Sequence, residues 1–315
     1  MKARNIFITL LYLSLVSVVV PFALGLLNWI HPLFDSFSHF RIHLLVVITI
    51  VVLLLLLLHK KIYRYIFGIL LLASGTYLYM LNQPYAPKAL SSSAVDTFTH
   101  MQFNLNFRNK RVGDLVAYWQ KNSIDIVTLQ EVTDAHRKVL EDIRELYPYQ
   151  SHCEFCPVVG GVSILSKYPI VSSSALCLDK RGFVSAQITI DDKQINIASI
   201  HLHWPYPYGQ YQQLETIKEE LIRLGQHEVP TLISGDFNAA PWSHAVDTIA
   251  QYSNTSVLNG TRWTIDLGRQ LPLVPNMKLP IDHLLLSKEL TSQSIKVEKS
   301  IGSDHLPIVS KISFK

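Results

Sequence analysis

The sequence predicts an α/β layered domain with mixed β-sheets, preceded by three transmembrane helices. Three nearly uncharged apolar runs fall within the first 81 residues, and beyond them short strand-like runs alternate with segments of helical periodicity. The 315 residues are 49% hydrophobic and only 17% charged, whereas soluble domains carry about 25% charged residues. This composition excludes a disordered or fibrous protein and indicates attachment to a membrane.

The apolar runs lie at residues 6–27, 42–58 and 63–81. The first is long enough to cross a bilayer core, and the two shorter runs have flanking residues that can anchor at the interface. The alternative interpretation is that the runs are buried core helices. A helix at the surface of a soluble domain needs a polar face toward water, and these runs have none. We therefore assign residues 1–81 to a three-helix membrane anchor in contact with lipid.

The distribution of Lys and Arg predicts how this anchor is oriented. Five of them lie at the N-terminus and between the second and third runs, against two on the opposite side. Because Lys and Arg are enriched on the cytoplasmic side, the N-terminus is predicted there and the C-terminal part outside, in the periplasm if the membrane is a bacterial inner membrane. If the first run were a cleaved signal peptide, two spans would still return the chain to that side.

A linker is predicted between the anchor and the rest of the chain. Residues 82–96 contain two prolines and a serine run, which leaves residues 97–315 as one large domain. Residues 1–91 hold seven Lys and Arg and one acid, a net charge of +6, whereas the remaining 21 basic and 23 acidic residues sum to −2. The larger domain therefore shows no overall charge attraction to nucleic acid.

Within residues 97–315, strands and helices are expected to alternate. Helical periodicity appears at 114–120, 134–146 and 210–224, and Asp191-Asp192 is typical of a hairpin turn between two strands. The expected strands are 98–105, 124–129, 162–165, 183–190, 194–202, 231–234, 281–286 and 308–314.

The three cysteines, Cys153, Cys156 and Cys177, are too few for a disulfide scaffold. A domain outside the cytoplasm can keep a disulfide, so a local bond between Cys153 and Cys156 is one expectation. No four Cys and His residues have the spacing of zinc ligands, so a soft-metal site is not expected.

Polar side chains fall at the ends of the predicted strands. They comprise Asn104, Glu131, His201, Asp236, Asn238, Asp282, Asp304 and His305. Each alone could be a turn former or a packed histidine, but together they supply hard oxygen ligands and imidazoles. Glu131 and Asp304 suit Mg²⁺, which prefers carboxylate oxygen. The set favours attack of water on a phosphate ester, where a metal offsets charge and a histidine polarised by a carboxylate removes a proton.

The motifs that carry these residues resemble those of the endonuclease/exonuclease/phosphatase superfamily over about residues 97–315. They occur in the family's order, as QFNLN, LQE, GGVSILSKYPI, SIHL, GDFN, IDH and GSDHLP. The resemblance implies two packed mixed β-sheets flanked by helices, the four-layer deoxyribonuclease I-like sandwich. The N-terminal part resembles the anchor of short bacterial members, of which the YafD-like proteins are the nearest.

The resemblance also implies roles for single residues. Glu131 would hold a divalent metal together with Asp304 and Asn104, and the expected ion is Mg²⁺, with Mn²⁺ and Ca²⁺ as alternatives. His305, oriented by Asp282, would be the general base for water. Asp236 is the alternative base, because the family mechanism is argued both ways.

Other positions are implied to meet the phosphate. Asn238 and His201 would bind the phosphoryl oxygens, and His201 would also serve the leaving group. Arg181 would reach the phosphate, with a solvated turn as the alternative, and His283 is expected to pack. The ring-bearing residues after His201 would line the pocket or face lipid, unless they form an ordinary loop: His203, Trp204, Tyr206, Tyr208 and Tyr211.

We therefore predict a membrane-anchored, Mg²⁺-dependent phosphoesterase that faces out of the cytoplasm. Its substrate would be a phospholipid headgroup or another small phosphoester, because membrane attachment raises the local concentration of such substrates. A membrane-tethered nuclease acting on DNA or RNA is the alternative. An inactive membrane-bound binding module is a third reading, which would require lost site residues that this sequence retains. No protein partner is implied.

Overall fold

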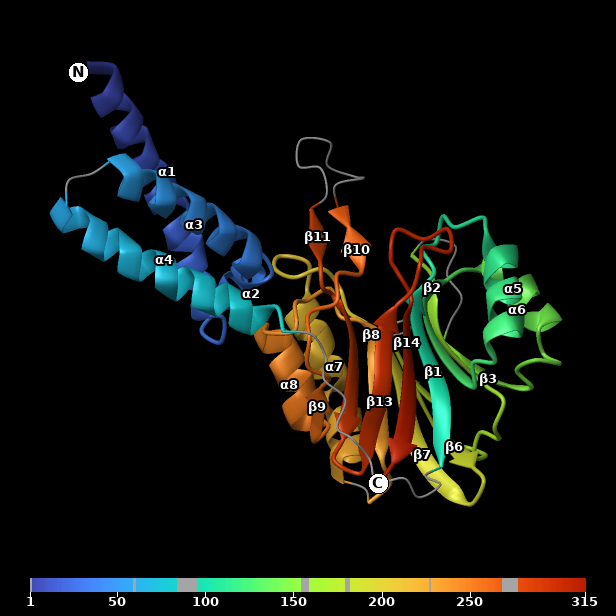
Figure 1. Cartoon of the computed structure of the whole chain (residues 1–315). Helices are drawn as coiled ribbons and strands as arrows, with labels where there is room; N and C mark the ends of the chain where they lie inside the picture. The colour runs from blue at the N-terminus through green and yellow to red at the C-terminus, as the bar shows by residue number, and fades with distance from the viewer. Residues whose placement is uncertain are drawn as a thin grey trace.

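The computed structural model describes residues 2–58, 61–83, 96–153, 159–178, 182–226, 228–267 and 277–315. Figure 1 shows two parts, a group of long helices at the N-terminus and a β-sandwich with helices on its outer faces. The predicted linker falls on a segment of which residues 84–95 lie outside the described chain, so the division into domains stays a prediction.

The N-terminal part contains α1 (Lys2–Leu26), a short α2 (Pro32–Ser38), α3 (Arg41–Leu58) and α4 (Lys61–Leu81). Helices α1, α3 and α4 are long and apolar enough to cross a membrane, in agreement with the three predicted runs. Their side chains pack together around Leu55, and the Arg4 guanidinium donates to the Leu58 carbonyl at 2.7 Å. The beginning of α1 therefore lies at the same end of the bundle as the end of α3.

The sandwich consists of two six-stranded mixed sheets. The first has the order β13-β14-β1-β2-β4-β3, formed by β1 (Thr97–Asn104), β2 (Ile126–Val132), β3 (Tyr149–His152), β4 (Gly161–Ser166), β13 (Leu290–Val297) and β14 (Ile308–Phe314). The second has the order β5-β6-β7-β8-β12-β9, formed by β5 (Leu176–Leu178), β6 (Phe183–Ile190), β7 (Lys193–His201), β8 (Thr231–Asp236), β9 (Thr255–Val257) and β12 (Asp282–Ser287). Strands β1 and β2 pair in parallel, as do β7 and β8.

Helices cover the outer face of each sheet. Helices α5 (Val112–Asn122) and α6 (Asp134–Asp142) pack on the first sheet, and α7 (Gln210–Gln226) and α8 (His244–Tyr252) pack on the second. A third apolar cluster, which includes Phe98, joins the inner faces of the two sheets. The layers therefore follow the order helix, sheet, sheet, helix, which confirms the predicted sandwich.

Several elements were not predicted from the sequence. These are α2, α8, the strands β3, β5, β9 and β13, and a small ribbon of β10 (Ile265–Asp266) and β11 (Lys278–Leu279). Strand β13 lies at a sheet edge, where half of its side chains alternate between partly buried and exposed, so it has no continuous apolar run. The predicted helix 134–146 is also shorter, because α6 ends at Asp142 and turns follow it. The Asp191-Asp192 hairpin is confirmed, since Ile190 pairs with Lys193.

The expected disulfide between Cys153 and Cys156 is wrong. Cys153 is bonded instead to Cys177, which lies 24 residues away in β5. The bond ties β5, at the edge of the second sheet, to the segment that follows β3 in the first sheet. Sequence separation favoured the nearer cysteine, but the packing of the two sheets brings the farther one into range.

Candidate active site

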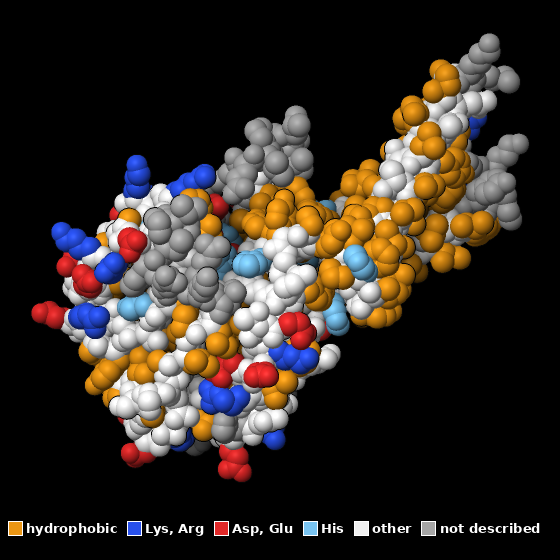
Figure 2. Space-filling model, turned by 180° about the vertical axis from the view of Figure 1, so that it is seen from behind, with side chains coloured by type: hydrophobic (Ala, Val, Ile, Leu, Met, Phe, Trp, Pro, Cys, Tyr) orange, Lys and Arg blue, Asp and Glu red, His pale blue; other side chains and the backbone are white. Residues whose placement is uncertain are grey.

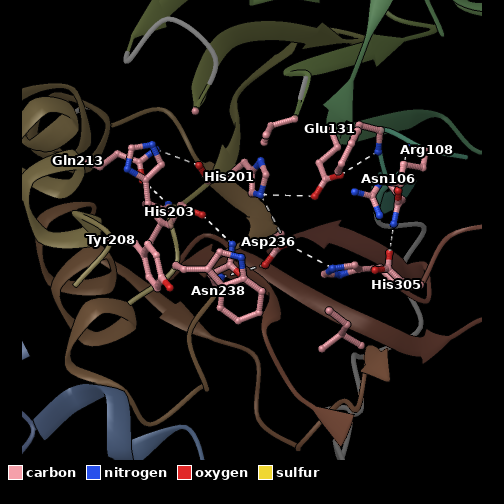
Figure 3. A pocket seen from close by; sticks show the side chains of 17 residues that line it. Asn106, Arg108, Glu131, His201, His203, Tyr208, Gln213, Asp236, Asn238 and His305 are labelled. Atoms are coloured by element: carbon pink, nitrogen blue, oxygen red, sulfur yellow. Dashed lines mark hydrogen bonds and ion pairs between the residues drawn. The ribbon is translucent and has the colours of Figure 1, made fainter. Parts of the chain in front are cut away.

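Strand ends bring the predicted polar side chains to one edge of the sandwich. Asn104 ends β1, and His201 and Asp236 end the neighbouring parallel strands β7 and β8. Strand β12 runs antiparallel to β8, so its first residue, Asp282, pairs with Asp236. Figure 3 shows that His201 of β7 and Asp236 of β8 point into one cavity, in which Glu131 of β2 faces His201.

The centre of the cavity is a cluster of carboxylates and imidazoles. His305 Nδ1 lies 2.8 Å from Asp282 Oδ2, and His305 Nε2 lies 3.5 Å from Asp236 Oδ2. His201 Nε2 lies 3.7 Å from the same Asp236 oxygen and 3.9 Å from Glu131 Oε1. Because the Asp282 carboxylate accepts the Nδ1–H of His305, Nε2 is the nitrogen through which this imidazole would gain or lose a proton.

Glu131 is held by several neighbours. Asn104 Nδ2 donates to Glu131 Oε1 at 3.1 Å and to Asp236 Oδ2 at 2.9 Å, and the Phe107 amide donates to Glu131 Oε2 at 2.8 Å. The Glu131 backbone has a φ of +56°, a conformation that non-glycine residues adopt rarely. A Cβ on Gly160 would collide with that backbone, so only glycine fits beside Glu131. Such local strain is typical of positions that serve a site.

The described residues contain two groups of side chains that could hold a metal ion, Glu131–His201–Asp236 and Asp236–Asp282–His305. The first group places two carboxylates beside one another at the wall of the cavity, and hard oxygen donors of this kind fit Mg²⁺. Closely spaced carboxylates also repel each other, so a divalent cation between them would relieve that repulsion. The donor set therefore fits a divalent metal.

The two other expected ligands are placed differently. Asp304 lines the same cavity, and its Oδ1 accepts a hydrogen bond from Asn106 Nδ2 at 2.6 Å. Asn104 directs its amide nitrogen toward the carboxylates, while its Oδ1 accepts from the Asn106 amide at 2.9 Å. Asn104 therefore bridges the carboxylates here, and its role as a ligand, like that of Asp304, stays a prediction.

Burial and neighbouring charges shift the proton affinities of these groups. Burial raises the pKa of Asp236 to about 6, to which Asp282 adds, while His305 and His201 oppose the rise. Burial alone would lower the pKa of His305, but the Asp282 and Asp236 carboxylates outweigh it and raise that pKa to about 10. For His201, burial prevails and lowers the pKa, so its imidazole is neutral at pH 7.

A buried polar network fixes Asp282 from behind. Gln102 Nε2 donates to Asp282 Oδ1 at 2.7 Å and to Gln130 Oε1 at 2.8 Å, and Gln130 Nε2 donates to Ser199 Oγ at 2.9 Å. This series of hydrogen bonds crosses from the first sheet to the second, and the residues that form it are buried. Sequence reasoning missed Gln102, although its spacing of two from Asn104 places both on one face of β1.

The cavity has a volume of about 730 Å³ and includes further residues that were not assigned from the sequence. Asn106 and the exposed Arg108 lie on the Glu131 side, where Arg108 supplies positive charge. His203, Trp204 and Tyr208 line the opposite wall, as the pocket interpretation of that segment predicted. In the sequence, the only sign that Asn106 belongs to the site is that it is a second asparagine two residues after Asn104.

The remaining assignments have mixed outcomes. Asn238 lines the cavity, while its Nδ2 donates to the Leu202 carbonyl at 2.8 Å and its amide donates to Asp236 Oδ1 at 2.9 Å. His283 is buried, with its Nε2 2.6 Å from the Ala239 carbonyl, which confirms the packing role. Arg181 lies outside the described residues.

These motifs and their geometry agree with one protein family, described as the endonuclease/exonuclease/phosphatase family, whose sequence pattern matches residues 101–305. The chain belongs to this family. Its members are hydrolytic phosphoesterases that depend on a divalent metal, which agrees with the carboxylate cluster described above. No curated protein matches the chain in sequence.

Solved structures of family members share this fold. TDP2 from D. rerio in complex with a single-strand DNA product is 17% identical with a TM-score of 0.57, covering 69% of this chain and 99% of that one. The human Nocturnin catalytic domain is 18% identical with a TM-score of 0.55, covering 70% and 95%. Sphingomyelinase C from Streptomyces griseocarneus is 14% identical with a TM-score of 0.50, covering 69% and 99%.

Metal binding by this family member should depend on pH. Below about pH 6 the Asp236 carboxyl group keeps its proton. A metal ion that binds to this group must then displace the proton. The apparent affinity for Mn²⁺ should therefore fall about tenfold for each pH unit below 6 and level off above it. Calorimetric titration of the wild type at pH 5 and pH 7.5 measures this, with Asp236→Asn as the variant in which the dependence should flatten. Equal affinity of the wild type at both pH values would contradict the involvement of Asp236.

Proposed function

We propose that this chain is a membrane-anchored, Mg²⁺-dependent phosphoesterase that hydrolyses a phosphate ester by attack of an activated water. The observation that carries the proposal is the His305–Asp282 pair, in which His305 Nε2 faces Asp236 in a cavity that also holds Glu131 and His201. A base, a neighbouring carboxylate cluster and neutral hydrogen-bond donors are the groups that hydrolysis of a charged ester needs.

In this proposal each residue has a defined task. Asp282 holds the Nδ1–H of His305, and His305 Nε2 takes a proton from water as the water oxygen bonds to phosphorus. The ester bond between phosphorus and the leaving oxygen breaks, and that oxygen accepts a hydrogen bond from the neutral His201 and takes its proton from water. Asn238 orients the phosphoryl oxygens. Glu131 and Asp236 would hold a divalent ion, which when bound would supply positive charge that offsets the phosphate.

The same ion would adjust the base. Without it, the Asp236 and Asp282 carboxylates raise the pKa of His305 to about 10, which keeps the imidazole protonated at neutral pH. A cation held by Asp236 would remove part of that negative field, and the pKa of His305 would then fall toward the working range of a base. The dependence on metal and the role of His305 as base are therefore linked.

The proposed substrate is a phospholipid headgroup or another small phosphoester. Three helices long and apolar enough to cross a membrane precede the site, and the related fold of a sphingomyelinase supports this substrate class. A nuclease is the second candidate, supported by the likeness to TDP2 with its single-strand DNA product. An inactive binding module is disfavoured, because the described site retains its carboxylates and both imidazoles.

An assay of the full chain in detergent micelles would test the function. With Mg²⁺ present we expect hydrolysis of a phospholipid panel or of bis(p-nitrophenyl) phosphate, and none after chelation. Cleavage of DNA or RNA without any action on these esters would favour the nuclease. Absence of hydrolysis of every substrate, with intact Mn²⁺ binding, would favour the binding module.

The proposed location is a bacterial inner membrane, with the N-terminus in the cytoplasm and the catalytic domain outside. Two observations support the topology. The start of α1 lies near the end of α3, while α2 and the end of α4 adjoin the catalytic domain. The Cys153–Cys177 bond also suits an oxidising compartment.

Fusions to the C-terminus would test this orientation. An alkaline phosphatase fusion should be active and a green fluorescent protein fusion dark, because the first folds outside the cytoplasm and the second inside it. Fusions at residue 60, between α3 and α4, should give the opposite pair and serve as the control. A fluorescent C-terminal fusion together with an inactive phosphatase fusion would contradict the proposed topology.

A further inference from the structure

The N-terminal helices contact the catalytic domain at the end of the sandwich that holds the cavity. Asn28 Nδ2 donates to the Trp242 carbonyl at 3.0 Å, and Trp242 Nε1 donates to the Ser38 carbonyl at 2.7 Å. At the end of α4, Thr261 Oγ1 donates to the Leu81 carbonyl. Trp242 follows Asn238 by four residues, so the chain that leaves the active site is bound to the anchor.

One buried carboxylate of the anchor completes this contact. Asp35 of α2 has no exposed surface, and its Oδ1 accepts from Ser38 Oγ at 2.9 Å and from the His244 amide at 2.9 Å. Its Oδ2 accepts from Tyr211 Oη at 2.8 Å and from the Ala245 amide at 3.1 Å. A buried charge is costly unless it is fully hydrogen-bonded, and a helix N-terminus favours a negative charge. The anchor thus supplies the charge at the N-terminus of α8, a helix of the catalytic domain.

The wall of the cavity is also bound to the anchor. Residues 203–209 connect β7 to α7, and Trp204 and Tyr208 of this loop line the cavity. Between them, the Tyr206 ring lies 5.7 Å from the His31 ring, and the Tyr206 carbonyl accepts from Ser36 Oγ at 3.4 Å. The anchor therefore holds the two loops that follow β7 and β8, the strands that carry His201 and Asp236.

Exposed apolar side chains continue from the anchor to this wall. At the junction of α1 and α2, Trp29 is 60% and Ile30 58% exposed, and on the loop Trp204, Tyr206 and Tyr208 are 45%, 47% and 70% exposed. Figure 2 shows hydrophobic side chains extending from the helices onto the adjacent face of the catalytic domain. Amphipathic rings of this kind favour the headgroup layer of a bilayer.

We propose that α2 and residues 203–209 hold the mouth of the cavity at the bilayer surface, so that the enzyme takes its phosphoester from the headgroup of a lipid in the membrane that anchors it. This inference rests on the proposed phosphoesterase function and adds to it the source of the substrate. A domain on a loose tether would also stay close to its own membrane, but its cavity would face that membrane only part of the time. A domain fixed through Asp35 keeps the mouth of the cavity turned toward the lipids of its own membrane.

The experiment compares three substrates for the full chain reconstituted in unilamellar vesicles with Mg²⁺. The first is a panel of phosphatidylethanolamine, phosphatidylglycerol and sphingomyelin in the same vesicles, the second is the same panel in added protein-free vesicles, and the third is soluble bis(p-nitrophenyl) phosphate. Release of the headgroup or of its phosphate is measured. We expect lipid in the same vesicles to be hydrolysed at least about tenfold faster than lipid in added vesicles.

Variants of the contact test whether orientation is the cause. Asp35→Asn keeps the size of the side chain but removes the charge, and it should lower same-vesicle lipid hydrolysis about tenfold while the soluble ester changes less than about twofold. Tyr211→Phe deletes a single hydrogen bond to Asp35 and should produce a smaller loss of the same selectivity. Asp142→Asn, on the exposed surface of α6, is the matched control and should change neither rate.

Several outcomes would overturn the inference. These are equal hydrolysis of lipid in the same and in added vesicles, hydrolysis of the soluble ester without any lipid, and proportional loss of both activities in Asp35→Asn and Tyr211→Phe. Proportional loss would mean that the contact only maintains the fold. Absence of hydrolysis of all three substrates by the wild type would instead reject the proposed function itself.

Discussion

Replacing His305 by alanine should lower kcat by about 10²–10⁴-fold, the usual loss when a general base is removed. His305 Nδ1 lies 2.8 Å from Asp282 Oδ2, and its Nε2 faces the cavity near Asp236. The variant therefore removes the atom proposed to take the proton of water. Turnover of bis(p-nitrophenyl) phosphate at saturating Mg²⁺ measures the loss, and a thermal unfolding curve checks that the fold persists.

A variant of Asp282, the residue that His305 contacts, tests whether the two residues act together. Asp282→Asn should also lower turnover, and the double variant should be little worse than His305→Ala, because the two residues act as a unit. His152→Ala is the matched control, since His152 is partly buried and bonds to Ser163 in β4 without lining the cavity. If the two losses multiply independently, Asp282 does not act through His305, and the base would be Asp236.

Glu131→Gln should lower activity by about 10²-fold or more, because a metal ion in such a site stabilises charge in the transition state by several kcal/mol. Glutamine keeps the shape and can still accept the Phe107 amide hydrogen bond, but it removes the charge that attracts the ion. Partial rescue at high Mg²⁺ is expected, because weaker binding can be offset by concentration. Activity measured against Mg²⁺ concentration shows the shift.

A control variant and a chelation experiment complete the test of Glu131. Glu215→Gln, on the exposed side of α7, removes the same charge away from the site and should leave the Mg²⁺ dependence unchanged. Chelation should abolish activity of the wild type, since the rest of the described site offers no other device of similar strength to offset phosphate charge. Full activity in excess chelator, or an unchanged Mg²⁺ dependence in Glu131→Gln, would contradict the metal role of Glu131.

The candidate site could be predicted largely because its chemistry is tied to strand ends. Glu131, His201 and Asp236 follow apolar runs, and the carboxyl ends of neighbouring parallel strands lie side by side. This places His201 of β7 beside Asp236 of β8, whereas the packing of the two sheets brings Glu131 of β2 to them. The approach did not find Gln102, because a glutamine inside an apolar strand gives no sign of the residue it will bond to across the sandwich.

The N-terminal helices show the same difference between what residues close along the chain reveal and what distant residues decide. The three long apolar helices follow from composition, since a run without polar residues needs lipid or a protein interior. Asp35, by contrast, was the one acid in the first 91 residues and appeared only as a charge to be counted. Its partners in the β-sandwich part of the chain lie more than 170 residues later, at Tyr211, His244 and Ala245.

The sequence alone therefore determined the apolar spans, the order of most strands and helices, and the residue types that meet at the strand ends. Periodicity and turn chemistry carry this information, because they act between residues that are close along the chain. The tertiary structure decided the Cys153–Cys177 bond, the support of Asp282 by Gln102, and the attachment of the catalytic domain to α2 through Asp35. Each joins segments far apart in the chain, and only the packing of whole layers sets whether such side chains meet.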